Sequence, residues 1–106
     1  MTDAELQAIG EKAVDVLRTI YDPEIPVDIY ELGLIYDVHV SDNCDIKILM
    51  TLTSPNCPVA ESLPEEVKEK VRSIQEVNDV ELELTFEPPW TKDLMSEEAK
   101  LELGFL

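Results

Sequence analysis

The sequence predicts an α+β fold in which a three-stranded mixed sheet carries helices on one face. Apolar residues recur at steps of three or four in two segments and at steps of two in three others, the periods of helices and strands. The helical period covers residues 6–20 and 59–74, and the strand period covers 34–40, 46–52 and 80–86. A chain of 106 residues has the length of one domain. We therefore expect residues 1–106 to form a single helix–β-hairpin–helix–strand–short helix sandwich.

The first helix begins at a capping box. Thr2 and Glu5 have the spacing at which each side chain caps the backbone N–H of the other. The predicted buried stripe of this helix consists of Leu6, Ile9, Ala13, Leu17 and Ile20. The helix must end near Tyr21, because Asp22 precedes Pro23 and a residue before proline avoids the helical region. Residues 22–26 are then extended or form a turn.

Two alternating strands on either side of the polar pair Asp42-Asn43 predict a β-hairpin. On the first strand, the expected core face holds Leu34, Tyr36, Val38 and Val40. On the second strand, it holds Ile46, Ile48, Met50 and Leu52. The third strand continues the pattern with Val80, Leu82, Leu84 and Phe86. The opposite face of the sheet is largely polar.

The start of the second helix has two interpretations. Pro58 suits the first helical position, which makes Cys57 the N-cap and requires a kink near Pro64. Alternatively, Ser62 and Glu65 have the spacing of a cap that lies further along the chain. We favour the start at Pro58.

Prolines and a tryptophan follow the third strand. Pro88 and Pro89 end it, and Trp90 is expected to anchor the final segment to the body of the domain. Ser96 then caps a short last helix, and Gly104 lies at its end.

The charge of the chain excludes some classes of partner. Eight basic residues against 24 acidic ones give a formal net charge of −16. Such a surface is repelled by phosphate backbones and by anionic membranes, so we expect neither nucleic acid nor a membrane as partner. The start of the chain lacks the basic and apolar regions of a signal peptide, and no apolar run approaches the ~20 residues of a membrane span. We therefore expect a cytoplasmic protein.

Cys57 is the candidate functional residue. It lies between the end of the second strand and the start of the second helix. The N–H groups and positive dipole of a helix N-terminus favour the thiolate, which binds metal or attacks electrophiles. A small apolar residue at a helix cap would explain the same position, so the pattern alone leaves both interpretations open.

The other sulfur and nitrogen ligands are not placed to help Cys57. Cys44 lies beside the hairpin turn, about 30 Å away along an extended strand. This separation excludes an intrachain disulfide. His39 is the single histidine and is expected on the solvent side of the sheet. Zinc and iron–sulfur sites usually take about four protein ligands, so Cys57 could hold a metal only transiently, with ligands from a partner, a second subunit or a small thiol.

Five polar side chains could support a site around Cys57: Asp22, Glu24, Thr51, Thr53 and Glu61. The two threonines lie just upstream of Cys57, and Glu61 lies one helical turn downstream. The two carboxylates of the 22–26 segment could fold over the end of the sheet. Each also has an ordinary structural explanation, as a strand hydroxyl, a solvated helix carboxylate or a turn cap.

Three blocks of sequence together are more specific than any single motif. They are DPEIPVDIYELGLIYDV at 22–38, MTLTSPNCPVAESLPEEV at 50–67 and EPPWTKDLMSEEAKLELG at 87–104. In these blocks the chain closely resembles the SufT-like and PaaD-like family of metal–sulfur (iron–sulfur) cluster assembly proteins. The resemblance implies a fold similar to the C-terminal domain of NifU-type scaffolds, and Cys57 as the key residue. It also implies roles for the five supporting residues named above.

Two details of the resemblance bear on function. The family pattern Asp-Leu-Gly reads Glu31-Leu32-Gly33 here, and the longer carboxylate arm weakens any site role for Glu31. The PaaD-like branch commonly carries a cysteine-rich tail, and no such tail follows Gly104, which favours the SufT-like branch.

The resemblance implies a maturation factor that carries iron–sulfur clusters or helps to insert them into client apoproteins. Its partners would be assembly proteins and clients, with a homodimer as a further option. Two alternatives stay open: a thiol enzyme with Cys57 as nucleophile and Thr51 or Thr53 orienting substrate, and an adaptor of the assembly machinery, including a PaaD-like role in oxygenase maturation. Because no Cys–His pair is evident, we expect a protein that is not an enzyme.

Overall fold

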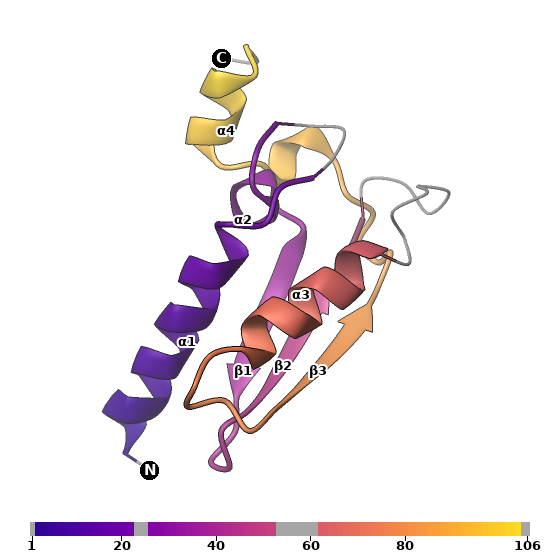
Figure 1. Cartoon of the computed structure of the whole chain (residues 1–106). Coiled ribbons are helices and arrows are strands. Elements are labelled where there is room, and N and C mark those ends of the chain that lie inside the picture. The colour runs from indigo at the N-terminus through magenta and orange to yellow at the C-terminus, as the bar shows by residue number, and fades with distance from the viewer. Residues whose placement is uncertain (1, 23–25, 53–61, 105–106) are drawn as a thin grey trace.

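The computed structural model describes residues 2–22, 26–52 and 62–104. Helices α1 (Asp3–Leu17) and α3 (Ser62–Arg72) contact each other and cover one face of a three-stranded sheet (Figure 1). The strands are β1 (Ile35–Val40), β2 (Asp45–Met50) and β3 (Asp79–Leu84). The shorter elements are α2 (Ile29–Leu32), the 3-10 helix η2 (Lys92–Leu94) and α4 (Glu97–Glu102). The α+β fold predicted from the sequence is confirmed.

The sheet is mixed, with β2 in the centre. β1 and β2 form the predicted antiparallel hairpin, and β3 pairs with β2 in parallel. The connection between β2 and β3 includes α3, as a parallel pair requires a crossover. The carboxyl ends of β2 and β3 therefore lie at the same end of the sheet, which is also where α3 begins (Figure 1).

The core lies between this sheet and the two long helices. Its central side chains are at most 2 % exposed and come from α1, β2 and α3: Ile9, Ala13, Leu17, Ile46, Ile48, Met50, Val67 and Val71. The opposite face carries exposed polar side chains: Asp37, His39, Lys47, Glu81 and Glu83. Alternation along each strand thus buries one face and leaves the other in water.

Helix α1 begins as predicted and ends earlier. The Glu5 N–H donates to Thr2 Oγ1 over 3.2 Å, and the Glu5 carboxylate accepts from the Thr2 N–H. The helix ends at Leu17, several residues before Tyr21. The reason is tertiary: the carbonyl of Ile20 accepts a hydrogen bond from the Ile29 N–H, at 2.8 Å, and so leaves the helical path.

The predicted core face of β1 is wrong at Tyr36. A register shift between Ile35 and Asp37 inserts one extra residue into the strand. As a result, Ile35 rather than Tyr36 pairs with Met50 and packs against the core. The Tyr36 hydroxyl instead donates to the carbonyl of Pro88 over 2.7 Å.

The predicted core face of β3 holds only in the first part of the strand. Val80 is buried and Leu82 packs against the core, whereas Leu84 is 37 % exposed and Phe86 is 39 % exposed. β3 is an edge strand that ends at Leu84, so side chains at its end and beyond have a neighbouring strand on one side only.

The start of α3 remains partly untested. The structure describes this helix from Ser62 onward, and the predicted beginning at Pro58 lies outside the described residues. Within the described part, Leu63, Val67 and Val71 are buried, in agreement with the helical period of apolar residues over 59–74.

The C-terminal segment folds back onto α2. The indole N–H of Trp90 donates to the Leu32 carbonyl over 2.9 Å, which confirms the predicted anchor. The Ser96 N–H donates to the Glu31 carbonyl over 2.8 Å, and its side chain caps α4. α4 contacts α2, and it lies beyond the layer formed by α1 and α3 (Figure 1). None of the described helices is long and apolar enough to cross a membrane.

Gly33 makes this docking sterically feasible. It ends α2 with a left-handed φ of 87°. A Cβ at this position would lie 2.7 Å from the carbonyl carbon of Leu94, and closer still to its oxygen. Only glycine combines the positive φ with so close a backbone approach.

Replacing Gly33 by alanine is therefore expected to destabilise the protein by roughly 2–4 kcal/mol, through left-handed strain plus overlap with Leu94. Gly104 is a matched control because its φ is also positive, at 82°, and a Cβ added there would meet no atom of the described residues within 4 Å. Gly104→Ala should cost only the left-handed strain, roughly 1–2 kcal/mol. Urea unfolding of both variants measures the difference, and equal losses would contradict the steric role of Gly33.

Candidate functional site

The candidate site lies at the end of the sheet where β2 and β3 end and α3 begins. Loops at the carboxyl ends of parallel strands commonly carry binding groups. The chain leaves β2 at Met50 and is described as far as Leu52, and it is described again from Ser62. Cys57, Thr53 and Glu61 fall between these points, outside the described residues, as does Glu24 in the earlier segment. Asp22 and Thr51 are the two predicted site residues that the structure describes.

Thr51 follows directly after β2 and is fully buried. Its N–H donates to the Leu34 carbonyl over 2.8 Å. Its hydroxyl has a long contact of 3.5 Å to the carbonyl of Leu52. A hydrogen bond at this distance is weak, so the hydroxyl contributes little to stability through it.

Asp22 is also buried, with 4 % of its surface exposed. Tyr21 and Asp28 form an isolated antiparallel bridge, and the Asp22 N–H donates to the Val27 carbonyl over 3.4 Å. These contacts join the described residues on the two sides of positions 23–25. Sequence reasoning treated Asp22 as a turn carboxylate, whereas the structure buries it.

Successive backbone hydrogen bonds connect the Asp22 segment to Thr51. Ile20 accepts from Ile29, Ile29 accepts from Leu34 over 3.1 Å, and Leu34 accepts from Thr51. Each bond joins a different piece of the chain. The positions of Asp22 and Thr51 are therefore coupled through the backbone of α2 and the start of β1.

These two side chains differ from every other polar side chain that the structure describes. Among the side chains of residues 2–22, 26–52 and 63–104, only those of Asp22 and Thr51 are polar and buried. Burying a carboxylate or a hydroxyl is unfavourable unless the group is paired, so such groups occur where structure or function requires them. The sequence prediction thus selected both of the buried polar side chains of the described chain.

Other candidates take structural or surface positions. Glu31 pairs with Arg18 over 3.5 Å and holds Ser96 through its carbonyl, so it joins α2 to its neighbours. His39 is exposed on the outer face of β1, as predicted. Cys44 lies in the hairpin turn, as predicted, with a left-handed φ of 65°. Its distance to Cys57 involves a residue outside the described part.

Sequence reasoning missed α2 and the residue that begins it. Asp28 is the N-cap, and its carboxylate accepts from the Glu31 N–H over 2.9 Å. The signal was present, because Asp28 and Glu31 have capping-box spacing and Gly33 follows at the C-cap. The helix is only four residues long, too short for a periodic apolar pattern.

The described residues do not by themselves form a metal centre. Within residues 2–22, 26–52 and 62–104, no three His, Cys, Asp or Glu side chains gather so that they could hold a metal ion. Asp22 is the one buried carboxylate there, and it can accept hydrogen bonds or bind a cation as one ligand among several.

Comparison with known proteins identifies the family of the chain. A sequence model of the family described as iron-sulfur cluster assembly protein matches residues 11–84. The chain is 57% identical over 96 residues to an Fe-S protein maturation auxiliary factor of Porphyromonas gingivalis, covering 91% of each chain. It is 43% identical over 98 residues to the Fe-S protein maturation auxiliary factor YitW of Bacillus subtilis, covering 92% of this chain and 96% of that one.

A solved structure extends the similarity to the fold. The crystal structure of a domain of unknown function from Bacillus anthracis superposes with a TM-score of 0.91 and 38% identity. The superposition covers 99% of this chain and all of the other. The matched family model, the curated relatives and this structure agree, and the chain belongs to the SufT-like family of iron–sulfur cluster assembly proteins.

Proposed function

We propose that this protein is an auxiliary factor of iron–sulfur protein maturation, which carries clusters or helps to insert them into client proteins through Cys57. The relatives named above carry the name of maturation auxiliary factors, at up to 57% identity over most of the chain. The observation that carries the proposal is the burial of Asp22 and Thr51, the two described members of the predicted site.

The position of these two residues supports their role. Thr51 lies two residues before position 53, where the segment that contains Cys57 begins. The backbone hydrogen bonds through Ile20, Ile29 and Leu34 connect the Asp22 segment to Thr51. Because both are held by buried backbone, they would fix the orientation of the neighbouring segments. Glu24, Thr53 and Glu61 complete the proposed site.

The cluster is a cargo in this proposal, and the remaining ligands come from elsewhere. Cys57 offers one thiolate, whereas iron–sulfur clusters are usually held by about four. A partner of the assembly machinery, a client apoprotein, a second subunit or a small thiol would supply the others. Ligand exchange between Cys57 and a client thiolate then transfers the cluster without net redox change.

The position of His39, the single histidine, argues against a role as the base of a cysteine-dependent enzyme. His39 is exposed on the outer face of β1 and pairs across the hairpin with Lys47. A cysteine nucleophile is usually activated by a nearby base such as histidine. The relatives, too, are named as auxiliary factors and not as enzymes.

The decisive variant is Cys57→Ser. We expect it to lose cluster uptake when the protein is incubated with iron, sulfide and glutathione, and to lose transfer to an apoferredoxin used as client. Wild-type protein without the added thiol should hold no stable cluster as a monomer. Folding should survive, because serine is at least as good as cysteine at a helix N-cap, where exchanges are worth about 1 kcal/mol. Visible absorbance and thermal melts measure the two properties.

Cys44→Ser is the matched control. It removes the other thiol of the chain, at a turn position that packs against the core. This variant should keep uptake and transfer, with a loss of stability equal to or larger than that of Cys57→Ser. If Cys57→Ser folds and still transfers clusters like the wild type, the thiolate mechanism is wrong and an adaptor role replaces it.

Thr51→Val tests the buried hydroxyl. The change keeps the branched shape and removes a hydroxyl whose contact is long, so the free energy of unfolding should change by less than about 1 kcal/mol. Cluster transfer should fall several-fold if the hydroxyl orients the Cys57 segment. Unchanged transfer in a folded Thr51→Val protein would make Thr51 a packing residue only.

A further inference from the structure

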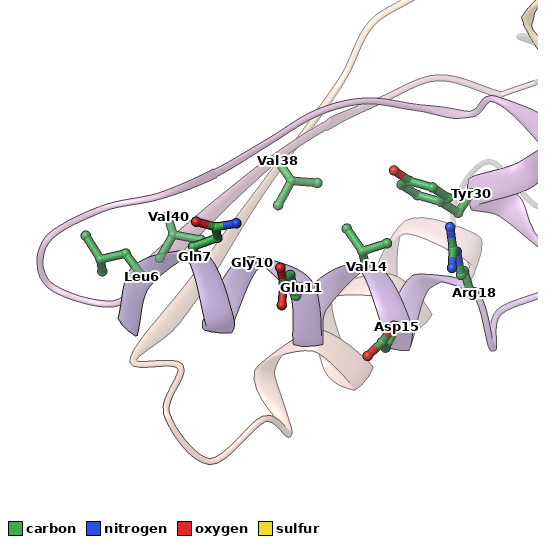
Figure 2. Close-up of a pocket in the computed structure, with 10 residues that line it drawn as sticks. All are labelled: Leu6, Gln7, Gly10, Glu11, Val14, Asp15, Arg18, Tyr30, Val38 and Val40. Atoms are coloured by element: carbon green, nitrogen blue, oxygen red, sulfur yellow. The ribbon is translucent and has the colours of Figure 1, made fainter. Parts of the chain in front are cut away.

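A groove runs between α1 and the edge strand β1, and neither Asp22 nor Thr51 lines it. It encloses about 720 Å³. Half-buried apolar groups form its walls: Leu6, Gly10 and Val14 on α1, and Val38 and Val40 on β1. In Figure 2, Val14 points toward β1, and Tyr30 and Arg18 lie at one end of the groove.

The edge of β1 that borders this groove is open for strand pairing. β1 pairs with β2 alone, so its other edge has no strand partner in the described sheet. The Ser41 N–H donates to the Asp45 carbonyl, which makes this pair a hydrogen-bonded one. Hydrogen-bonded and non-hydrogen-bonded pairs alternate, so Val38 and Val40 direct their N–H and C=O groups away from β2. Their side chains and their outward backbone groups thus border the same groove.

Gly10 adds an independent observation. A glycine inside a helix costs about 0.5–1 kcal/mol relative to alanine. Packing does not require it here, because a Cβ at Gly10 would meet only Val40 Cγ2, at an ordinary contact distance of 3.7 Å. A larger side chain would project into the groove. The glycine is explained if the space above it is used by another chain.

The charges around the groove indicate what could fill it. Glu11 and Asp15 lie on the flank of α1, and neither forms a salt bridge with a described residue. The one basic side chain of the lining, Arg18, is paired with Glu31 and lies over the Tyr30 ring, 5.1 Å from its centroid. The uncompensated charge at the groove is therefore negative.

We propose that this groove binds an extended basic segment of a partner protein, which adds to the sheet as a strand along β1. Backbone pairing at Val38 and Val40 would supply affinity, and alternate apolar side chains would enter the groove over Gly10. The lysine or arginine side chains that alternate with them lie on the other face of the added strand, where the uncompensated negative charge of Glu11 and Asp15 attracts them without direct pairing. A second copy of this chain fits the groove poorly, because each copy carries a net charge of −16.

The test uses a synthetic probe and the full chain. The probe is a capped peptide of about eight residues that alternates valine and lysine, the length of a strand that can cover β1. Its control has the same sequence with N-methyl groups on alternate backbone amides, which blocks pairing on one edge. Titration into isotopically labelled protein should shift the amide signals of Val38, Val40 and the neighbouring turns of α1. The methylated peptide should bind at least about tenfold more weakly, or about 1.4 kcal/mol.

Matched variants separate the groove from general attraction to an acidic protein. Gly10→Leu fills the groove and should weaken binding at least about tenfold, while its melting temperature stays at or above that of the wild type. Ala8→Leu, on an exposed position of the same helix outside the groove, should leave binding unchanged. The pair Glu11→Gln and Asp15→Asn should weaken binding and flatten its salt dependence, whereas Glu81→Gln with Glu83→Gln, exposed on β3, should do neither.

Three outcomes would overturn the proposal. The first is a set of shifts that spreads over the acidic surface or lies at β3. The second is equal affinity of the two peptides for the wild-type protein, a comparison that needs no variant to fold. The third is self-association of the wild type, measured by sedimentation, that Gly10→Leu abolishes, because the groove would then be occupied by a second copy. These binding readouts do not involve Cys57, so they remain informative even if the maturation role fails.

Discussion

The close approach of the Leu94 backbone to Gly33 is the contact that lets the C-terminal segment dock onto α2. Gly33 ends α2 in a left-handed conformation, and the missing Cβ lets the C-terminal segment pass directly over it. On either side of this contact, Trp90 and Ser96 donate to the carbonyls of Leu32 and Glu31. A four-residue helix is not stable alone, so α2 keeps its geometry because neighbouring segments satisfy its backbone.

Helix α2 in turn positions the two buried polar residues. At the start of the α2 region, the Ile29 N–H donates to the Ile20 carbonyl. Just after α2, the Leu34 carbonyl accepts from the Thr51 N–H. A distortion of α2 would therefore reach both Asp22 and Thr51. A contact in the C-terminal segment is thus connected, through α2, to the two described residues of the proposed site.

The two surfaces proposed here have different chemistry and lie on different parts of the sheet. In the sequence, Cys57 follows the end of β2, whereas the groove follows the edge of β1 (Figure 2). A factor that brings assembly machinery and clients together needs at least one docking surface apart from the transferring thiolate. The net charge of −16 would speed association with basic partners and keep copies of this protein apart.

The sequence by itself determined the elements that local chemistry controls. The capping box at Thr2, the N-cap at Ser96, the hairpin around Asp42 and the three alternating strands all formed, because caps, turns and amphipathic periods act within a few residues. The tryptophan anchor and the membership of the family could also be predicted, the latter from three blocks of residues read together. The selection of Asp22 and Thr51 came from their proximity in sequence to Cys57 and from the resemblance.

Tertiary structure decided what depends on segments that are distant in sequence. The bulge that turns Tyr36 away from the core depends on the partner strand, and the early end of α1 depends on the pairing of Ile20 with Ile29. The requirement for glycine at position 33 comes from Leu94, and the groove over Gly10 comes from the spacing of α1 and β1. Alternation and capping describe one element at a time, so they carry no information about which backbone will approach from elsewhere in the chain.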